Sequence, residues 1–444
     1  MSKSSSGQVL SRRQFLKATA MMAGMTAAST FLGACAPKPE AAQPTPSGPL
    51  RLVSWDYRPA IVEENLKVFR EMYGEQVEYQ PLPGQYQTVV ETKLIGGEHI
   101  DVMYIHTDQI NRWTKAGWVR FIDDMPGVDE IKKALLPANL VGLSNLEGRL
   151  VALPYYTGCR AFMYNEEKLS QAGFQPPTTW EEFIEQCREI QKKGISKHPF
   201  IPYWIATEYA TWSWFSMWYS EGEPVFDDKY EPTFKDGGVA FKKVLEMMKL
   251  MYDEQIVPPD VLTMKDHTGT FGTGEHVFMH HSNYIQQALN NPQTSKIAGK
   301  VRNALLPGKT RQTMGWTEGY AMSPNAPKDR AWELMKFLGY KDKEGKFRVA
   351  KSWVLQAGLG SAYRDVMDDP EVVAAFSKWT DLKIWNEQVE KAKSRGVSQA
   401  FWYPEWNMFL VTTVHDYLQG KKPIDETIKV LYDKVVELKA KYPG

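Results

Sequence analysis

The sequence has few cysteines, no metal-binding motif and, after residue 35, no apolar run of membrane-spanning length. Its 444 residues include three cysteines, at positions 35, 159 and 187, and neither a C-x-x-C nor an H-E-x-x-H pattern occurs. A helix that crosses a bilayer needs about 20 consecutive apolar residues. We therefore expect a folded body outside the membrane, with no metal and no cofactor.

Two of the cysteines could form a disulfide, but the local pattern favours free thiols. Cys187 shares a spacing of i, i+4 and i+7 with Phe183 and Ile190, which is typical of one face of a helix. Cysteine at such a position is commonly a small buried apolar residue. We predict that Cys159 and Cys187 are buried and unpaired.

The chain also lacks an excess of charge of either sign. It has 53 basic and 53 acidic residues, and the first 35 residues hold four of the basic ones and none of the acidic ones. The remainder is thus mildly acidic, which gives no electrostatic reason to bind nucleic acid. Its length predicts two or three domains.

Motifs for nucleophilic or phosphate chemistry are missing as well. No G-x-S-x-G elbow is present, and the spacing of Gly269 and Gly274 fails as a phosphate loop because Glu275 and His276 follow. The neighbouring His280 and His281 would point to opposite faces of a strand, which disfavours a shared metal ion.

The N-terminal segment has the order of an export signal. Arg12 and Arg13 precede an uncharged apolar run from 18 to 32, and Leu-Gly-Ala-Cys ends at Cys35. Paired arginines are typical of twin-arginine export, and the last four residues resemble the lipobox of bacterial lipoproteins, in which the cysteine is lipidated. We expect residues 1–35 to be a signal peptide and Cys35 to anchor an exported protein to a membrane. A cleaved signal with an incidental cysteine is the alternative.

Residues 36–49 contain five prolines, which favour an extended polyproline II conformation. At about 3.1 Å per residue the segment would extend roughly 40 Å. We interpret it as a tether.

The body begins with short alternating strands and helices. Strands are predicted at 50–55, 77–80 and 101–105, with helical spacing between them. This alternation is typical of a βαβ layout with a parallel sheet, in which ligands bind beyond the carboxyl ends of the strands. Asp56 and the run His106–Asp108 are therefore expected at one rim.

Several motifs further along resemble one known family in their order. Leu146–Asn165 forms two strand-like pieces around Pro154, Thr179 begins a capping box, and Leu305–Ala326 contains Leu-Pro-Gly, Gly-Trp and Ser-Pro-Asn-Ala. This succession resembles the extracellular solute-binding proteins of ABC importers, in particular the carbohydrate-binding, maltose-binding-protein-like branch. The resemblance covers nearly all of the chain after residue 49.

The resemblance implies an α/β fold of the two-lobe periplasmic-binding-protein type (type II). Each lobe would be a mostly parallel sheet flanked by helices, and hinge crossovers would join the lobes. It also implies a chain that passes back and forth between the lobes. We expect residues 50–156 and 306–362 in the first lobe, and 157–305 and 363–444 in the second.

A sugar site needs flat aromatic surfaces together with polar groups for the hydroxyls. The sequence offers both where the family keeps its site, and the tryptophan after Gly315 is the foremost stacking candidate. The candidate ligand-binding residues are Asp56, Tyr86, His106, Asp108, Tyr155, Tyr156, Trp204, Trp212, Asn283, Trp316, Glu318 and Trp406.

The expected function is therefore capture of a neutral carbohydrate by hinge closure and its delivery to an ABC permease, by a monomer without enzymatic activity. Two alternatives remain. One is a secreted enzyme that acts on polysaccharide with two carboxylates. The other is a surface adhesion protein that uses its aromatic patches.

Overall fold

The computed structural model describes residues 48–84 and 86–442. The predicted export arginines Arg12 and Arg13, the lipidation site Cys35 and nearly all of the tether lie outside the described residues.

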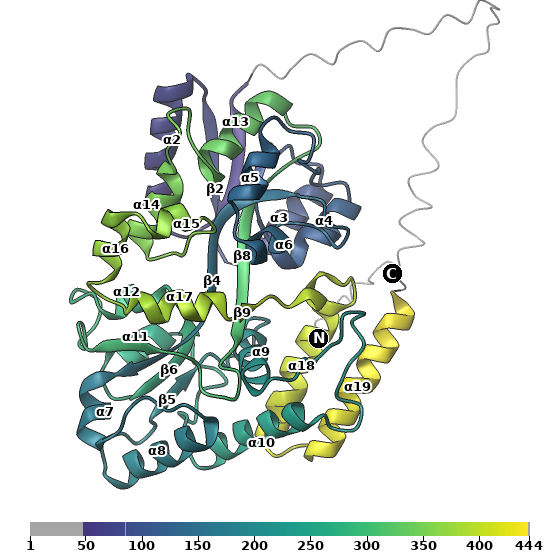
Figure 1. Cartoon of the computed structure of the whole chain (residues 1–444). Coiled ribbons are helices and arrows are strands. Elements are labelled where there is room, and N and C mark those ends of the chain that lie inside the picture. Colours follow the sequence, from purple (N-terminus) through teal and green to yellow (C-terminus); the bar gives the residue numbers. More distant parts are fainter. Residues whose placement is uncertain (1–47, 85, 443–444) are drawn as a thin grey trace, which may run out of the picture. The chain divides into compact units, whose positions relative to one another are not determined.

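Two long antiparallel strands, β4 (Ala152–Asn165) and β8 (Thr313–Met322), run through the whole body. The first half of β4 and the second half of β8 pair within one group of strands, and the second half of β4 pairs within another. Figure 1 shows β4 and β8 as the two strands that connect the upper and lower parts of the body. We call these parts the first and the second lobe.

The first lobe contains a twisted sheet in the order β2-β1-β3-β8-β4, with helices around it (Figure 1). Its elements, besides β4 and β8, are β1 (Leu50–Trp55), α2 (Pro59–Tyr73), β2 (Val77–Leu82), α3 (Tyr86–Ile95), β3 (Val102–His106), η2 (Thr107–Gln109), α4 (Ile110–Lys115), α5 (Val128–Ala134), α6 (Pro137–Gly142), α13 (Lys328–Gly339), α14 (Arg348–Ala357), α15 (Arg364–Met367) and α16 (Pro370–Phe376).

In the second lobe, the end of β4 pairs with β6 and β7, and β5 lies beside β6. Its elements are α7 (Glu166–Ala172), α8 (Trp180–Lys192), β5 (Phe200–Pro202), α9 (Ala210–Glu221), α10 (Val239–Asp253), α11 (His267–Gly272), β6 (Phe278–Ser282), α12 (Ile285–Leu289), β7 (Val301–Ala304), α17 (Leu382–Glu390), β9 (Ala392–Lys393), η3 (Gly396–Gln399), α18 (Tyr403–Leu418) and α19 (Ile424–Lys441).

The two-lobe α/β class predicted from the sequence is confirmed, but the sheet is mixed rather than mostly parallel. Strands β1, β2 and β3 are parallel to one another, as their helical connections require. Strands β3, β8, β4 and β6 pair antiparallel, in that order. The reason is that the chain crosses between lobes on the strands β4 and β8 themselves, and not through crossover helices.

Residues 152–165 form one continuous strand, whereas the sequence predicted two pieces separated around Pro154. Proline cannot donate to a strand ladder and normally interrupts one. Here the pairing of β4 with β8 shifts its register between Pro154 and Tyr156. Because of this irregularity, the missing N–H of Pro154 does not end the pairing, and the strand continues beyond it.

Local signals account for many helix boundaries. Helix α2 ends at Gly74, which has a φ of 74° that glycine adopts without strain. Helix α8 begins after Thr179, whose side-chain oxygen accepts a hydrogen bond from the backbone N–H of Glu182 at 3.1 Å. The predicted N-cap is thus confirmed, but the carboxylate of Glu182 accepts from the backbone N–H of Thr178 instead of closing the box on Thr179.

Aromatic side chains fill much of the second lobe. Trp214, Phe215 and Trp218 of α9 are buried, and Trp218 stacks on Phe241 of α10 at 4.7 Å between ring centroids. Cys187 lies in the same interior and, like Cys159, is a buried free thiol, as predicted.

Among residues 48–84 and 86–442, the structure contains no helix whose length and apolar character would let it cross a membrane.

Replacing Gly158 by alanine tests the close packing between β4 and β8. An alanine Cβ at this position would lie 2.7 Å from Cζ2 of Trp316, which is closer than van der Waals contact allows. We expect a loss of about 1–3 kcal/mol in the free energy of unfolding, measured by urea denaturation. Gly48→Ala, where the new methyl group meets nothing within 4 Å, should change it by less than about 0.5 kcal/mol. Equal effects would contradict the packing argument.

Candidate functional site

The two shared strands present four large side chains to one side of the sheet. Tyr156 and Arg160 lie on β4, and Trp316 and Glu318 lie on β8. Alternate residues of a strand point to the same face. The register pairs Tyr156 with Glu318 and Gly158 with Trp316, so that these groups meet where the lobes join.

These side chains line a cavity of about 260 Å³ between the lobes. Its walls come from the ends of β1 and β3, from the start of α3 and α9, and from β4, β6 and β8. Of the candidates named from the sequence, the cavity is lined by Tyr86, His106, Tyr156, Trp212, Trp316 and Glu318.

Trp212 and Trp316 form an aromatic wall. Their ring centroids are 4.6 Å apart, and His106 stacks on the other side of Trp212 at 5.1 Å. The indole N–H of Trp316 donates a hydrogen bond of 3.1 Å to the hydroxyl of Tyr156. Gly158 lies beneath the Trp316 indole, and no larger residue would leave room for it. The wall offers flat apolar surface with polar groups at its edge.

Glu318 is a carboxyl group in an apolar and aromatic environment. Burial raises its pKa to about 8, although the hydroxyls of Tyr104 and Tyr156 oppose the shift. Its Oε1 lies 3.8 Å from Nε2 of His106. The Nδ1 atom of that histidine accepts a hydrogen bond from the backbone N–H of Asp108, and burial lowers its pKa. Both groups are therefore neutral at pH 7.

Arg160 brings a positive charge to the opposite end of the cavity. Its Nη1 donates to Oγ of Ser282 and its Nη2 donates to the carbonyl oxygen of Tyr209, each at 3.0 Å. The guanidinium also lies 5.0 Å from the ring centroid of Tyr203 and 5.5 Å from that of Trp212. Burial lowers its pKa to about 10, so the group stays charged at neutral pH.

Asp108 does not line the cavity and instead joins the lobes beside it. Its Oδ2 accepts a 2.7 Å hydrogen bond from Arg395, which precedes η3. Burial raises the pKa of Asp108, but the charge of Arg395, together with smaller effects of His106, Ser398 and Arg112, outweighs burial, and the pKa is lowered. Arg395 also donates to the hydroxyl of Tyr403. This pair fixes η2 of the first lobe to the second lobe.

Three further candidates near the strands also lie outside the cavity. Asp56 is an exposed loop residue. Tyr155 alternates with Tyr156 on β4 and so faces the opposite side, where it packs edge-on against Trp353 at 4.8 Å. Asn283 is buried and accepts a hydrogen bond from the backbone N–H of Cys159. We leave these residues out of the proposed site.

Two tryptophan candidates belong to the interior of the second lobe. Trp406 packs against Phe226 at 5.0 Å and donates its indole N–H to the carbonyl oxygen of Leu431. Trp204 is fully buried beside Phe200. Large aromatic residues contribute most to cores, and this role explains both positions better than ligand contact.

The sequence analysis missed several residues of the cavity. One signal was available for Arg160, because it follows Tyr156 and Gly158 at the two-residue period of a strand face. Tyr209 likewise precedes Trp212 by three residues, which is one helical turn. The missed lining residues are Trp55, Gly84, Gln87, Tyr104, Arg160, Tyr203, Tyr209, His281 and Ser282.

His280 and His281 point to different sides of β6, as their alternation predicted. His281 lines the cavity, whereas His280 is fully buried outside it. Within the described part of the chain, no group of three or more histidine, cysteine, aspartate or glutamate side chains could hold a metal ion.

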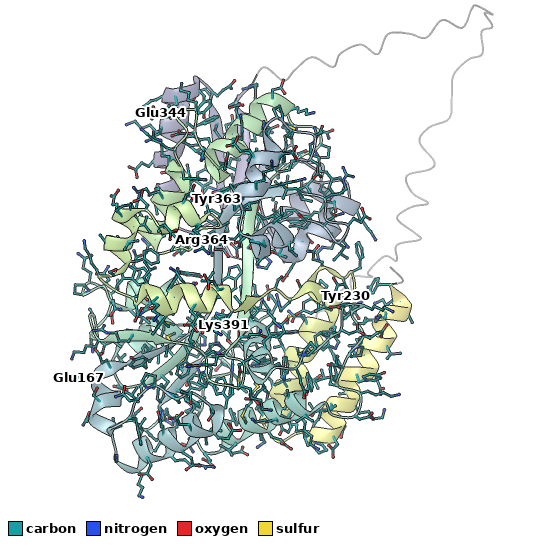
Figure 2. The ribbon with its side chains drawn as sticks, viewed as in Figure 1. Glu167, Tyr230, Glu344, Tyr363, Arg364 and Lys391 are labelled. Atoms are coloured by element: carbon teal, nitrogen blue, oxygen red, sulfur yellow. The ribbon has the colours of Figure 1, made fainter. Side chains whose placement is uncertain are left out.

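A second and larger cavity, of about 370 Å³, lies where β4 and β8 meet α6, α15 and α17. Its walls include Leu136, Met367 and Trp385 and are mostly apolar. Arg364 of α15 lies at this cavity in the upper lobe, and Lys391 follows α17 in the lower lobe (Figure 2). Charged and polar side chains line this cavity too, among them Arg364, Asp368 and Glu390, but its aromatic residues are only Trp316, which it shares with the smaller cavity, and Trp385. The smaller cavity is therefore the better candidate for a ligand that stacks on aromatic rings.

Residues 56–342 match the model of a family described as bacterial extracellular solute-binding protein. A putative binding protein of Brucella abortus (strain 2308) is 25% identical over 265 residues, which cover 58% of this chain and 62% of that protein. The lactose-binding protein of Rhizobium radiobacter is 21% identical, with coverage of 72% and 76%.

Solved structures share the fold. The maltose-bound MalE3 of T. maritima superposes with a TM-score of 0.76 at 21% identity and covers 88% of this chain and 99% of its own. A solute-binding protein of Agrobacterium radiobacter K84 in complex with ribitol gives a TM-score of 0.74 at 19% identity, with coverage of 90% and 100%.

The variant Glu318→Gln tests the protonation of Glu318. In the folded protein the carboxyl group of Glu318 has a pKa of about 8, whereas the pKa of an unshifted glutamate is 4.5. Between these values the folded state binds the additional proton, so this contribution to the free energy of unfolding falls as pH rises. The variant lacks this contribution.

We therefore expect the stability of the wild type relative to Glu318→Gln to fall by at least about 1.4 kcal/mol, which is one pKa unit, from pH 5 to pH 8. Urea unfolding at pH 5, 6.5 and 8 measures the difference, and the effects of the histidines other than His106, which lies beside Glu318, cancel because both proteins share them. A difference that is independent of pH would show that Glu318 ionises normally.

Proposed function

The chain belongs to the family of bacterial extracellular solute-binding proteins, and on this basis we propose that it captures a carbohydrate between its lobes and delivers it to the permease of an ABC importer. The observation that carries this proposal is the cavity at β4 and β8, where the aromatic wall of Trp212 and Trp316 faces convergent polar groups. Sugars present apolar C–H faces and hydroxyls, and this combination of surfaces suits both.

The relatives support a sugar or polyol as the ligand class. Printed names among them include a lactose-binding protein and a melibiose/raffinose/stachyose-binding protein, and the structural neighbours hold maltose, ribitol and tagatose. The cavity of about 260 Å³ lies slightly below the usual range of about 300–1,000 Å³ for small-molecule sites. We infer a ligand of one or two sugar rings.

Contacts across the cavity favour closure of the lobes around the ligand. The hydroxyl of Tyr209 donates to Oε1 of Gln87 at 3.3 Å, and Asp108 pairs with Arg395. Each contact joins the first lobe to the second. We propose that these bonds break when the lobes open about the hinge in β4 and β8 and that they form again on ligand binding.

The lobe limits inferred from the sequence, 50–156 with 306–362 and 157–305 with 363–444, remain proposals. Helix α16 packs on α14, and α14 packs on α2. These contacts favour a first lobe that continues to about residue 376. The return to the second lobe would then fall just before α17.

The cellular placement also remains a proposal from the sequence. We propose export through the twin-arginine signal Arg12–Arg13 and lipid anchoring at Cys35, followed by the proline-rich tether, with the protein acting as a monomer at the outer side of a membrane. The family name, extracellular solute-binding protein, supports export.

A polysaccharide-cleaving enzyme fits the cavity less well. Glycoside hydrolases use two carboxyl groups about 5–9.5 Å apart on either side of the bond that breaks. Glu318 is the single carboxyl group among the described residues that line the cavity. We therefore propose binding without catalysis, and a surface adhesion role has no feature of this structure in its favour.

Ligand binding can be tested by thermal shift across mono- and disaccharides and polyols. A true ligand at 100 times its dissociation constant should stabilise the protein by about 2.7 kcal/mol. Calorimetry on the best ligand then compares variants. We expect Trp212→Phe and Trp316→Phe to weaken binding about 3- to 10-fold, because each loses stacking surface worth about 0.5–1.5 kcal/mol.

The matched control is Trp406→Phe, which changes a buried tryptophan far from the cavity. It should lower the melting temperature and leave the dissociation constant unchanged. Equal loss of affinity in all three variants would place the ligand elsewhere. Release of reducing ends from oligosaccharides over hours would instead support the enzyme.

A further inference from the structure

Arg160 is a buried cation without a counter-ion. Its exposed fraction is 2%, and it forms no ion pair with a carboxylate of the described residues. Its hydrogen bonds go to a hydroxyl and a backbone carbonyl, and its Nε is buried without a partner. Burying a charge is costly unless that charge is paired.

Arg395 provides an internal comparison. It is buried to the same degree, with 1% exposed, but Asp108 contacts it at 2.7 Å. The fold thus supplies a carboxylate to the buried arginine that holds the lobes together. It supplies none to the arginine that lines the cavity.

The rings of Tyr203 and Trp212 lie at cation–π distance from Arg160, but no described residue that lines the cavity supplies a negative charge to balance it at pH 7. Glu318, the one lining carboxyl group among the described residues, is neutral at pH 7 because burial raises its pKa to about 8. Burial and the nearby Arg160 lower the pKa values of His267, His280 and His281, so that these rings are neutral too. The cavity without ligand therefore carries one net positive charge.

Donor groups gather around that charge. The Nδ1 of His281 accepts a 2.7 Å hydrogen bond from the backbone N–H of Ser282, which leaves the proton of the neutral ring on Nε2. His281 lines the cavity beside Arg160. Of the five N–H donors of the Arg160 guanidinium, two form hydrogen bonds with described residues, and the Nε–H is buried without a partner.

We propose that the carbohydrate carries a carboxylate, as a uronic acid does, and that Arg160 binds this group. The inference rests on the proposed function, since it specifies the ligand class of the same site, and it replaces the neutral sugar expected from the sequence. A planar carboxylate with one negative charge matches one guanidinium fork in shape and in charge. A phosphate would bring up to two charges, and only one cation faces it.

The test uses sugar pairs that differ only at C6. Calorimetry and thermal shift on the purified protein compare D-galactose with D-galacturonate, D-glucose with D-glucuronate, and galactobiose with digalacturonate. We expect at least one acid to bind 10-fold or more tightly than its neutral partner. Galactose 6-phosphate is the fourth arm, and we expect it to bind more weakly than galacturonate.

Arg160→Gln should weaken binding of the acid at least about 10-fold more than binding of its neutral partner, so that the preference for the acid is lost. Arg160→Lys keeps the charge without the fork and should retain part of the preference. Arg70→Gln removes an exposed positive charge from α2 and should change nothing. The comparison within the wild type holds even if a variant at position 160 fails to fold.

The outcomes separate the two proposals. If a neutral sugar binds as tightly as its acid, the proposal that the ligand carries a carboxylate is wrong, and the proposal of carbohydrate binding is unaffected. Tighter binding of galactose 6-phosphate than of galacturonate would also contradict the carboxylate proposal. If citrate or malonate binds and no sugar does, the proposed function fails while Arg160 remains an anion site. No response to any of these probes overturns the inference.

Discussion

The structure depends on the direct pairing of β4 with β8. These two strands belong to both lobes, and their register places Tyr156 opposite Glu318 and Gly158 opposite Trp316. Because alternate residues share a face, the pairing that connects the lobes also assembles the cavity between them. The lack of a side chain at Gly158 lets the Trp316 indole lie across the strand pair. The strands that connect the lobes therefore also form a wall of the cavity between them.

Arg160 and Arg395, both fully buried, have different roles in this molecule. Arg395 is neutralised by Asp108 and holds η2 against η3, so its contribution is to the closed arrangement of the lobes. Arg160 is left for a ligand to neutralise. Glu318, kept neutral by burial, adds a polar contact without repelling an anion. A site built in this way discriminates between ligands, because a ligand that leaves a buried polar or charged group unpaired binds with a penalty in free energy.

The sequence predicted the parts of this structure that arise from local chemistry. Strand β1 and the Thr179 cap follow from short-range pattern, and the family resemblance implied the two lobes. Tertiary pairing decided the rest. The sequence does not distinguish Trp406 from Trp212. The packing of α18 on α19 makes Trp406 a core residue, and the packing of α9 on β8 places Trp212 in the wall of the cavity. Pro154 could not be placed within a continuous strand without knowledge of the register shift that accommodates it.

The central claim is that the ligand binds on the face of β4 and β8 that carries Trp316 and Arg160. A crystal structure of the protein grown with the sugar that stabilises it most tests this directly. The account predicts electron density for the sugar against Trp212 and Trp316, within hydrogen-bond distance of Arg160. Density in the cavity lined by Leu136 and Trp385, with the first cavity holding only water, would contradict it.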